Sequence, residues 1–105
     1  MDKVVLELDY QCFPMWIYSE GGELIDNDLI PELQGNRKIE RLLTAIQDQF
    51  NSLFLDTETE FSYVGFSNIK DREDFKNQVN LLIELIQPVI ETQYQFENLI
   101  DVDKM

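Results

Sequence analysis

The stretch that decides the fold is MWIYSEGGELID, residues 15–26. Residues 15–18 are apolar or aromatic on both faces, which is typical of a covered or central β-strand. The glycine pair within residues 20–23 can adopt the positive φ angles that tight hairpin turns require. Residues 24–26 then predict a short returning strand, so this part of the chain is expected to form an antiparallel hairpin.

The residues before this hairpin predict one more strand. From Lys3 to Tyr10, apolar and polar side chains alternate, and this period of two indicates a half-buried strand. Pro14 separates it from the next strand, because proline cannot donate a hydrogen bond to a central ladder. In that next strand, Trp16 and Tyr18 are expected to share one face, since strand side chains alternate between faces.

The first predicted helix follows the hairpin. Between about Arg37 and Phe54, apolar residues recur three and four positions apart, which gives one apolar stripe. Asn36 is the expected N-cap of this helix. Residues 61–66 (FSYVGF) are aromatic and β-branched, so they predict another strand, and Gly65 within it indicates a bulge or a close backbone approach.

A second amphipathic helix is predicted after that strand, with Ser67 or Asn68 as its N-cap. Its apolar stripe continues through Pro88, which should kink the helix or end it near Ile86 because proline removes a backbone donor. Residues 94–102 alternate only loosely. They are expected to form either an edge strand or a frayed tail, and the sequence does not decide between the two.

These elements predict an α+β fold within a single acidic domain that covers residues 1–105. The order is β-β-(β)-α-β-α-(β), with strands grouped before helices rather than alternating strictly with them. That order favours an antiparallel sheet of three to five strands, with the two amphipathic helices packed on one face.

The charge of the chain is large and uneven. There are 21 acidic and eight basic residues, which give a net charge of −13. Residues 1–35 hold eight acids and one base, a local charge of −7, whereas residues 36–55 have a local charge of +1. Such a field repels nucleic acids and anionic lipids and favours cationic partners. Binding to nucleic acid or to a membrane surface is therefore not expected.

Residues for catalysis are mostly absent, so we expect that the protein is not an enzyme. The chain has no histidine and a single cysteine, which excludes the common catalytic triads and a tetrahedral zinc site. Residues 26–28 (DND) begin like a calcium loop but lack its glycine and its twelfth-position glutamate. Glu58 and Glu60 are better interpreted as exposed acids than as a glycosidase pair. No cofactor and no metal are expected.

The sequence also predicts a soluble cytoplasmic protein. Acids interrupt the apolar run at the N-terminus (MDKVVLELD), so no signal peptide is expected there. No apolar stretch approaches the roughly 20 residues that a membrane-spanning helix needs. Cys12 is the only cysteine, so no disulfide within the chain is possible, which suits a reducing compartment.

The stretch LELDYQCFPMWIYSEGGELIDNDLIPEL (residues 6–33) resembles the N-terminal half of small immunity proteins from bacterial polymorphic-toxin systems. The later FSYVGF segment, followed by a capped helix, extends the resemblance over about residues 5–90. The resemblance implies a cytoplasmic antitoxin that covers the active site of a cognate toxin. Such toxins are commonly nucleases with basic, phosphate-binding clefts.

The charge pattern leads to the same hypothesis, because carboxylates can occupy the positions at which a nuclease holds phosphates. Two patches are predicted to bind the basic surface of a cognate toxin. The first has Tyr18 as its anchor and continues through the acids Glu20, Glu23, Asp26, Asp28 and Glu32. The second, as an alternative, consists of Asp56, Glu58 and Glu60.

Two other functions remain open at this stage. One is an inhibitor of a DNA-binding enzyme that mimics nucleic acid. The other is a non-catalytic structural or regulatory subunit, whose partner face would be apolar. The sequence does not decide the oligomeric state.

Overall fold

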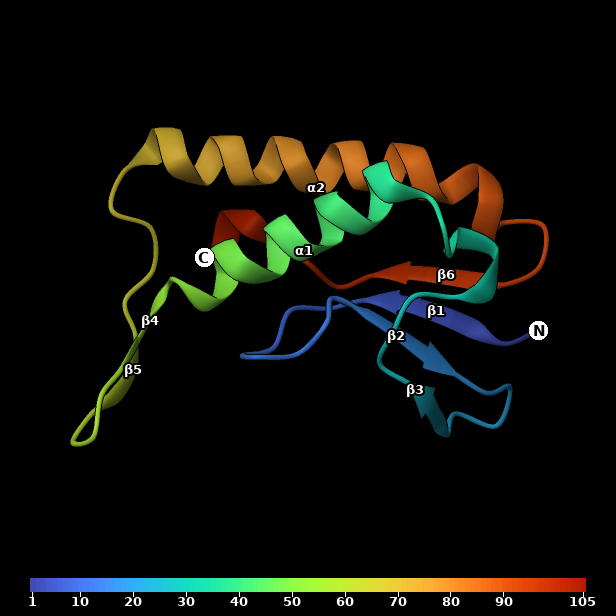
Figure 1. The fold of residues 1–105 in the computed structure, drawn as a ribbon, viewed down its shortest axis with the longest axis horizontal. Coiled ribbons are helices and arrows are strands. Elements are labelled where there is room, and N and C mark those ends of the chain that lie inside the picture. Colours follow the sequence, from blue (N-terminus) through green and yellow to red (C-terminus); the bar gives the residue numbers. More distant parts are fainter.

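A computed structural model describes residues 1–105 and has the predicted α+β fold. It contains two α-helices, six strands and two short 3-10 helices (Figure 1). In chain order the elements are β1 (Lys3–Leu6), β2 (Met15–Tyr18), β3 (Leu24–Asp26), η1 (Pro31–Leu33), α1 (Arg37–Asn51), β4 (Phe54–Asp56), β5 (Phe61–Tyr63), α2 (Ile69–Ile90), β6 (Gln95–Asn98) and η2 (Val102–Lys104).

The main sheet has four strands in the order β3-β2-β1-β6. The hairpin predicted over residues 15–26 is present, because β2 pairs with β3 in antiparallel fashion and Gly22 in the turn has a φ of 86°. The expectation of a wholly antiparallel sheet is wrong, since β6 pairs with β1 in parallel. Parallel neighbours need a long crossover connection, and here nearly the whole chain lies between them. Residues 94–102 thus provide an edge strand and then η2.

The strand predicted over residues 61–66 lies elsewhere than expected. Only Phe61–Tyr63 is extended, and it pairs with β4 in a separate two-stranded sheet. Gly65 has a φ of 74°, which turns the chain away after the strand. The first helix ends at Asn51 rather than at Phe54, because Phe54 begins β4. The β4–β5 hairpin projects from one end of the molecule (Figure 1).

Both helices lie over the same side of the main sheet (Figure 1), as predicted. The side chains that meet there are apolar, and none of the fully buried residues is charged. The core cluster comprises Val4, Leu6, Met15, Ile17, Leu29, Ile30, Leu33, Ile39, Leu43, Ile46, Phe75, Val79, Leu82, Ile86, Ile90, Ile100 and Val102. No helix is long and apolar enough to span a membrane.

The helix starts agree with the sequence patterns, whereas the end of α2, like that of α1, differs from the prediction. Asn36 and Asn68 are the N-caps, and each side-chain oxygen accepts a hydrogen bond from a backbone N–H of the first turn. The prediction that Pro88 ends or kinks α2 near Ile86 is wrong about the end, since the helix continues to Ile90. Ile90 is fully buried, and burying it offsets the hydrogen bond lost at the proline.

Candidate protein-binding surface

The acidic side chains of this protein are largely unpaired. Ion pairs engage five of the 21 acidic residues, namely Glu20, Asp74, Glu97, Asp101 and Asp103. No acidic residue is buried. Most carboxylates therefore face solvent without a cation of the same chain beside them, and their charge is available to a partner.

Tyr18 and Glu20 lie at the face of the main sheet that the helices leave open. Trp16 and Tyr18 share this face and are half-buried, while Met15 and Ile17 point into the core, as the alternation predicted. A hollow of about 610 Å³ opens here. It is lined by Met1, Lys3, Val5, Glu7, Tyr18, Ser19, Glu20, Gly22, Gln95, Glu97 and Leu99. Of the six residues predicted for the first patch, only Tyr18 and Glu20 line this hollow.

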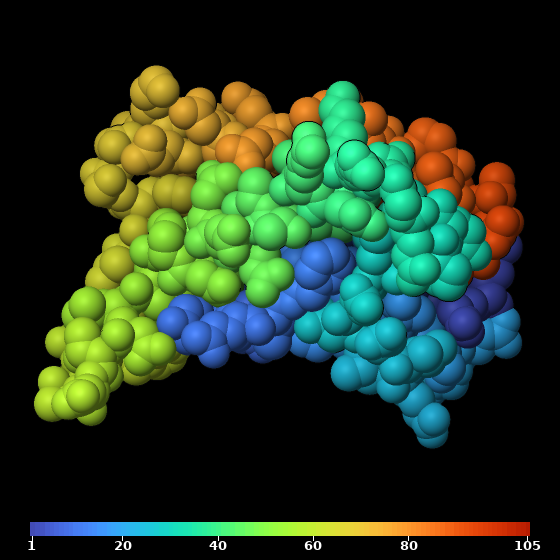
Figure 2. Space-filling view, in the orientation of Figure 1, coloured from blue at the N-terminus to red at the C-terminus, as the bar shows by residue number.

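The other acids of the first patch are spread along the segment that leads to α1. Glu23 is exposed in the turn between β2 and β3, and Asp26 is exposed at the end of β3. Asp28 borders a shallow groove beside α1 and accepts a hydrogen bond from the N–H of Leu29. In Figure 2 this segment forms a continuous band, light blue to teal, down one side of the molecule. The structure therefore gives a strip rather than one compact patch.

Glu32 is tied to the end of α2. Its carboxylate accepts a hydrogen bond of 2.8 Å from the hydroxyl of Tyr94. Burial, together with this hydrogen bond, raises the pKa of Tyr94 to about 12. This acid therefore has a structural contact that joins η1 to the chain just before β6.

The raised pKa of Tyr94, which is due first to burial and then to this hydrogen bond, makes the stability of the fold depend on pH in the alkaline range. Since the folded pKa of Tyr94 lies above its ordinary value of 10.0, folding favours the neutral phenol. We expect Tyr94→Phe to be less stable than the wild type below pH 10 and the difference to shrink as the pH rises toward 12. Urea denaturation of both proteins across this range measures the difference. A gap that stays constant with pH would show that the hydroxyl is not coupled to folding.

The second predicted patch lies on the projecting hairpin. Asp56 ends β4, and Glu58 and Glu60 lie in the turn before β5, all exposed. Within the turn, the backbone N–H of Thr57 donates to the carbonyl of Glu60 at 2.8 Å. The structure thus brings the three acids together on one short element.

An aromatic cluster accompanies these acids. Phe54 is its centre, with ring centroids 4.7 Å from Tyr10, 5.4 Å from Phe61 and 5.2 Å from Tyr63. Tyr10 comes from the loop after β1, and its hydroxyl donates a 3.0 Å hydrogen bond to Asp56. This bond is the main reason that the pKa of Tyr10 is raised. The contacts hold the hairpin against the body of the protein.

Much of this cluster is exposed to solvent. Phe61 is 57% exposed, Tyr63 45% and Val64 61%. Aromatic residues beside charges are the composition of protein-binding hot spots. The sequence predicts residues 61–66 as a strand and does not single them out as a binding site. The available signal was the occurrence of aromatic residues on both sides of an acidic turn, which a hairpin brings together: Phe54 lies opposite Tyr63 in the β4–β5 pairing.

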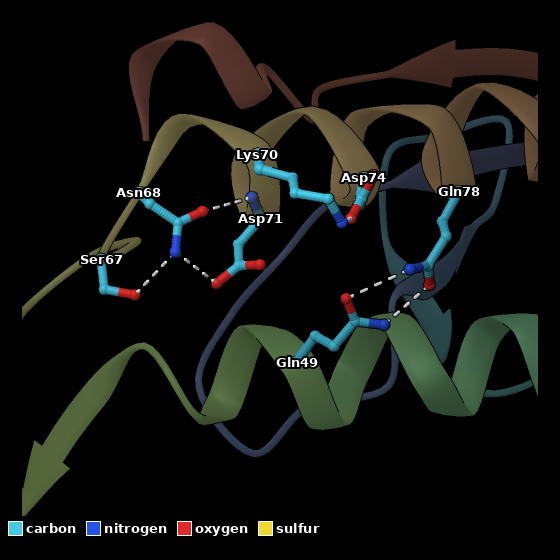
Figure 3. Close-up of polar contacts among 7 residues, drawn as sticks. All are labelled: Gln49, Ser67, Asn68, Lys70, Asp71, Asp74 and Gln78. Carbon is cyan, nitrogen blue, oxygen red and sulfur yellow. Dashed lines mark hydrogen bonds and ion pairs between the residues drawn. The ribbon is translucent and has the colours of Figure 1, made fainter.

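A groove lies between the start of α2 and the end of α1, and the polar side chains that line it bind one another. Asn68 accepts a hydrogen bond from the N–H of Asp71 and donates one to the Asp71 carboxylate, which fixes the first turn of α2 (Figure 3). Gln49 and Gln78 exchange amide hydrogen bonds of 2.7 and 3.2 Å across the two helices (Figure 3). These polar groups satisfy one another and join the helices.

The side chains do not assemble a metal centre. No group of three or more acidic, cysteine or histidine residues converges on a point where an ion could be held. Asp26 and Asp28 instead accept hydrogen bonds from the backbone N–H groups of Asn27 and Leu29. The groups that this surface presents to a partner are unpaired carboxylates and exposed aromatic rings.

No family model matches the chain, and no curated protein matches it either.

Proposed function

We propose that the protein binds a basic partner protein and neutralises it, in the manner of an immunity protein that covers the active site of a toxin. The single observation that carries this proposal is the surplus of exposed, unpaired carboxylates. Residues 4–36 and 42–69 contain no lysine or arginine, so both acidic surfaces lie in segments without cations. Complementary charge steers such a partner toward the surface and accelerates binding.

A nuclease toxin is the partner that this chemistry fits best. Its cleft needs cationic side chains to hold phosphates, and an array of carboxylates can take their place. A cytoplasmic location would place the antitoxin where such a nuclease acts. Fast association also suits an inhibitor that must bind before damage accumulates.

The experiment starts with capture of the partner from the native host and continues with stopped-flow association kinetics. We expect the association rate to fall by about tenfold or more between roughly 20 and 200 mM salt. The charge reversals Asp26→Lys with Asp28→Lys, and Glu58→Lys with Glu60→Lys, separate the two acidic surfaces. Glu84→Lys, at an exposed position of α2, is the control outside both surfaces; it reverses one charge, whereas each double variant reverses two.

The results of these measurements distinguish between the possible functions. Slower association in one double variant, with Glu84→Lys nearly unchanged, supports charge-steered inhibition and assigns the surface. Association that hardly responds to salt or to either reversal contradicts it and favours a structural subunit with an apolar interface. Inhibition of the captured partner by the wild-type protein is the functional readout. A captured DNA-binding enzyme would favour the nucleic-acid mimic instead.

A further inference from the structure

We infer that the β4–β5 hairpin is the anchoring arm of this protein, inserting into a concave site of the partner with an apolar floor and a basic rim. The hairpin arm is defined here as residues 54–64. The inference rests on the proposed function, because it takes the partner to be a basic protein. It goes further by assigning the main binding contacts to exposed aromatic residues that lie outside the segment 18–32.

The molecule is elongated, with the hairpin arm at one end (Figure 1). The hairpin arm, yellow-green in Figure 2, protrudes from one corner of the body. The longest dimension of the protein is 42 Å, against 28 and 25 Å for the other two. Neither β4 nor β5 pairs with a strand of the main sheet. A narrow projecting element is complementary to a cleft rather than to a flat surface.

The hairpin arm also exposes apolar surface. Phe61 and Tyr63 contact Phe54, but these contacts leave about half of each side chain exposed to solvent. Leu55 and Val64 are exposed as well, and the pairing of β4 with β5 places Leu55 on the face opposite to Phe61 and Tyr63. In globular proteins, exposed apolar groups of this kind mark interaction sites.

The charges around the arm indicate the chemistry of the site that it enters on the partner. Asp56, Glu58 and Glu60 surround the aromatic residues, and the exposed Asp9 lies next to Tyr10 in the adjoining loop. No lysine or arginine lies between residues 42 and 69. A second copy of this chain would bring equal negative charge against the arm, which disfavours self-association. A partner with basic groups at the rim of its site matches both the charge and the apolar tip.

The arm is also held in place before binding. The carbonyl of Leu53, a buried residue, accepts hydrogen bonds of 2.7 and 3.1 Å from the N–H groups of Val64 and Gly65. The Tyr10 hydroxyl fixes Asp56 from the other side. Because these contacts order the hairpin in the free protein, less conformational entropy is lost when it binds.

Site-specific photo-crosslinking in the native host tests the inference. p-Benzoylphenylalanine is introduced in place of Phe61, in place of Leu24 on β3, or in place of Ile69. Leu24 and Ile69 are 53% and 70% exposed and serve as matched apolar positions outside the arm. We expect a crosslink from position 61 to a basic protein, with little or none from position 69. Crosslinks from position 24 alone would overturn the arm while leaving the proposed function intact. The absence of a basic partner at every position would overturn both.

Affinity measurements with the crosslinked partner provide the quantitative test. Phe61→Ala should weaken binding by about 30-fold or more, as expected for an anchor residue, and mainly through faster dissociation. Val64→Ser, which leaves the aromatic contacts in place, should weaken it less but measurably. Ile69→Ala should bind like the wild type. If Phe61→Ala and Val64→Ser both bind as tightly as Ile69→Ala, while circular dichroism shows them folded, the arm is not the anchor.

Discussion

Replacing Phe75 by alanine is expected to lower the free energy of unfolding by about 3 to 5 kcal/mol. Phe75 lies on α2, is fully buried and belongs to the core cluster between the helices and the sheet. Its ring centroid lies 5.4 Å from that of Phe66, so the substitution also removes an aromatic contact. A domain of this size has only about 5 to 15 kcal/mol of stability in total. The expected loss is therefore a large share of the total stability.

Urea denaturation followed by circular dichroism measures this loss. Phe61→Ala is the matched control, because it removes the same side chain from a position that is 57% exposed. The control loses two aromatic contacts, with Tyr10 and Phe54, and should cost about 1 to 2 kcal/mol, less than Phe75→Ala. Equal losses in the two variants would mean that Phe75 does not belong to the core cluster.

Local patterns in the sequence predicted the parts of the fold that depend on neighbouring residues. Asn36 and Asn68 act as N-caps because an asparagine side chain reaches the N–H group three residues ahead. The apolar stripe of α1 places Ile39, Leu43 and Ile46 in the core, as spacings of three and four require. Such features follow from helix geometry alone, so they can be predicted without knowing the rest of the structure.

Features that depend on distant contacts were mispredicted. The parallel pairing of β6 with β1 joins the two ends of the chain, and no local pattern specifies it. The continuation of α2 past Pro88 depends on burial of Ile90 among residues that are far away in the sequence. In both cases tertiary packing outweighs a local preference.

The candidate site also combines features that local sequence predicts with features that depend on distant contacts. The acidic residues were recognisable from composition, but their positions in space were not. Alternating apolar residues predict a strand with two faces and do not reveal whether another layer covers either face. The sequence predicts a strand that contains Phe61 and Tyr63, but it does not reveal that this strand lies in a separate two-stranded sheet and leaves both side chains exposed.

The second large effect on stability is expected from replacing Asn27. It lies in the DND segment (residues 26–28), and its side chain joins two parts of the chain. Its Oδ1 accepts a 3.1 Å hydrogen bond from the N–H of Phe13, and its Nδ2 donates to the carbonyls of Phe13 and Met15 at 2.6 and 2.9 Å. The three bonds connect the segment after β3 to the start of β2 and are partly shielded from water.

We expect Asn27→Ala to lower the free energy of unfolding by about 2 to 4 kcal/mol, because three hydrogen bonds are lost and their backbone partners stay partly buried. Asn27→Asp should cost at least as much at neutral pH, since a carboxylate cannot donate to the two carbonyls. Asp28→Asn is the neighbouring control. It removes one charge at an exposed position, and its amide oxygen can still accept from Leu29, so its stability should change by less than about 1 kcal/mol.

The same variants separate stability from binding. Asn27→Ala leaves the charge unchanged and should not alter the association rate with a basic partner as long as the protein is folded. Asp28→Asn should leave stability nearly unchanged and slow association if the strip of residues 18–32 takes part in steering. Denaturation and stopped-flow measurements on both proteins make the distinction. If Asn27→Ala is as stable as the wild type, the side-chain bonds to Phe13 and Met15 do not fix this part of the fold.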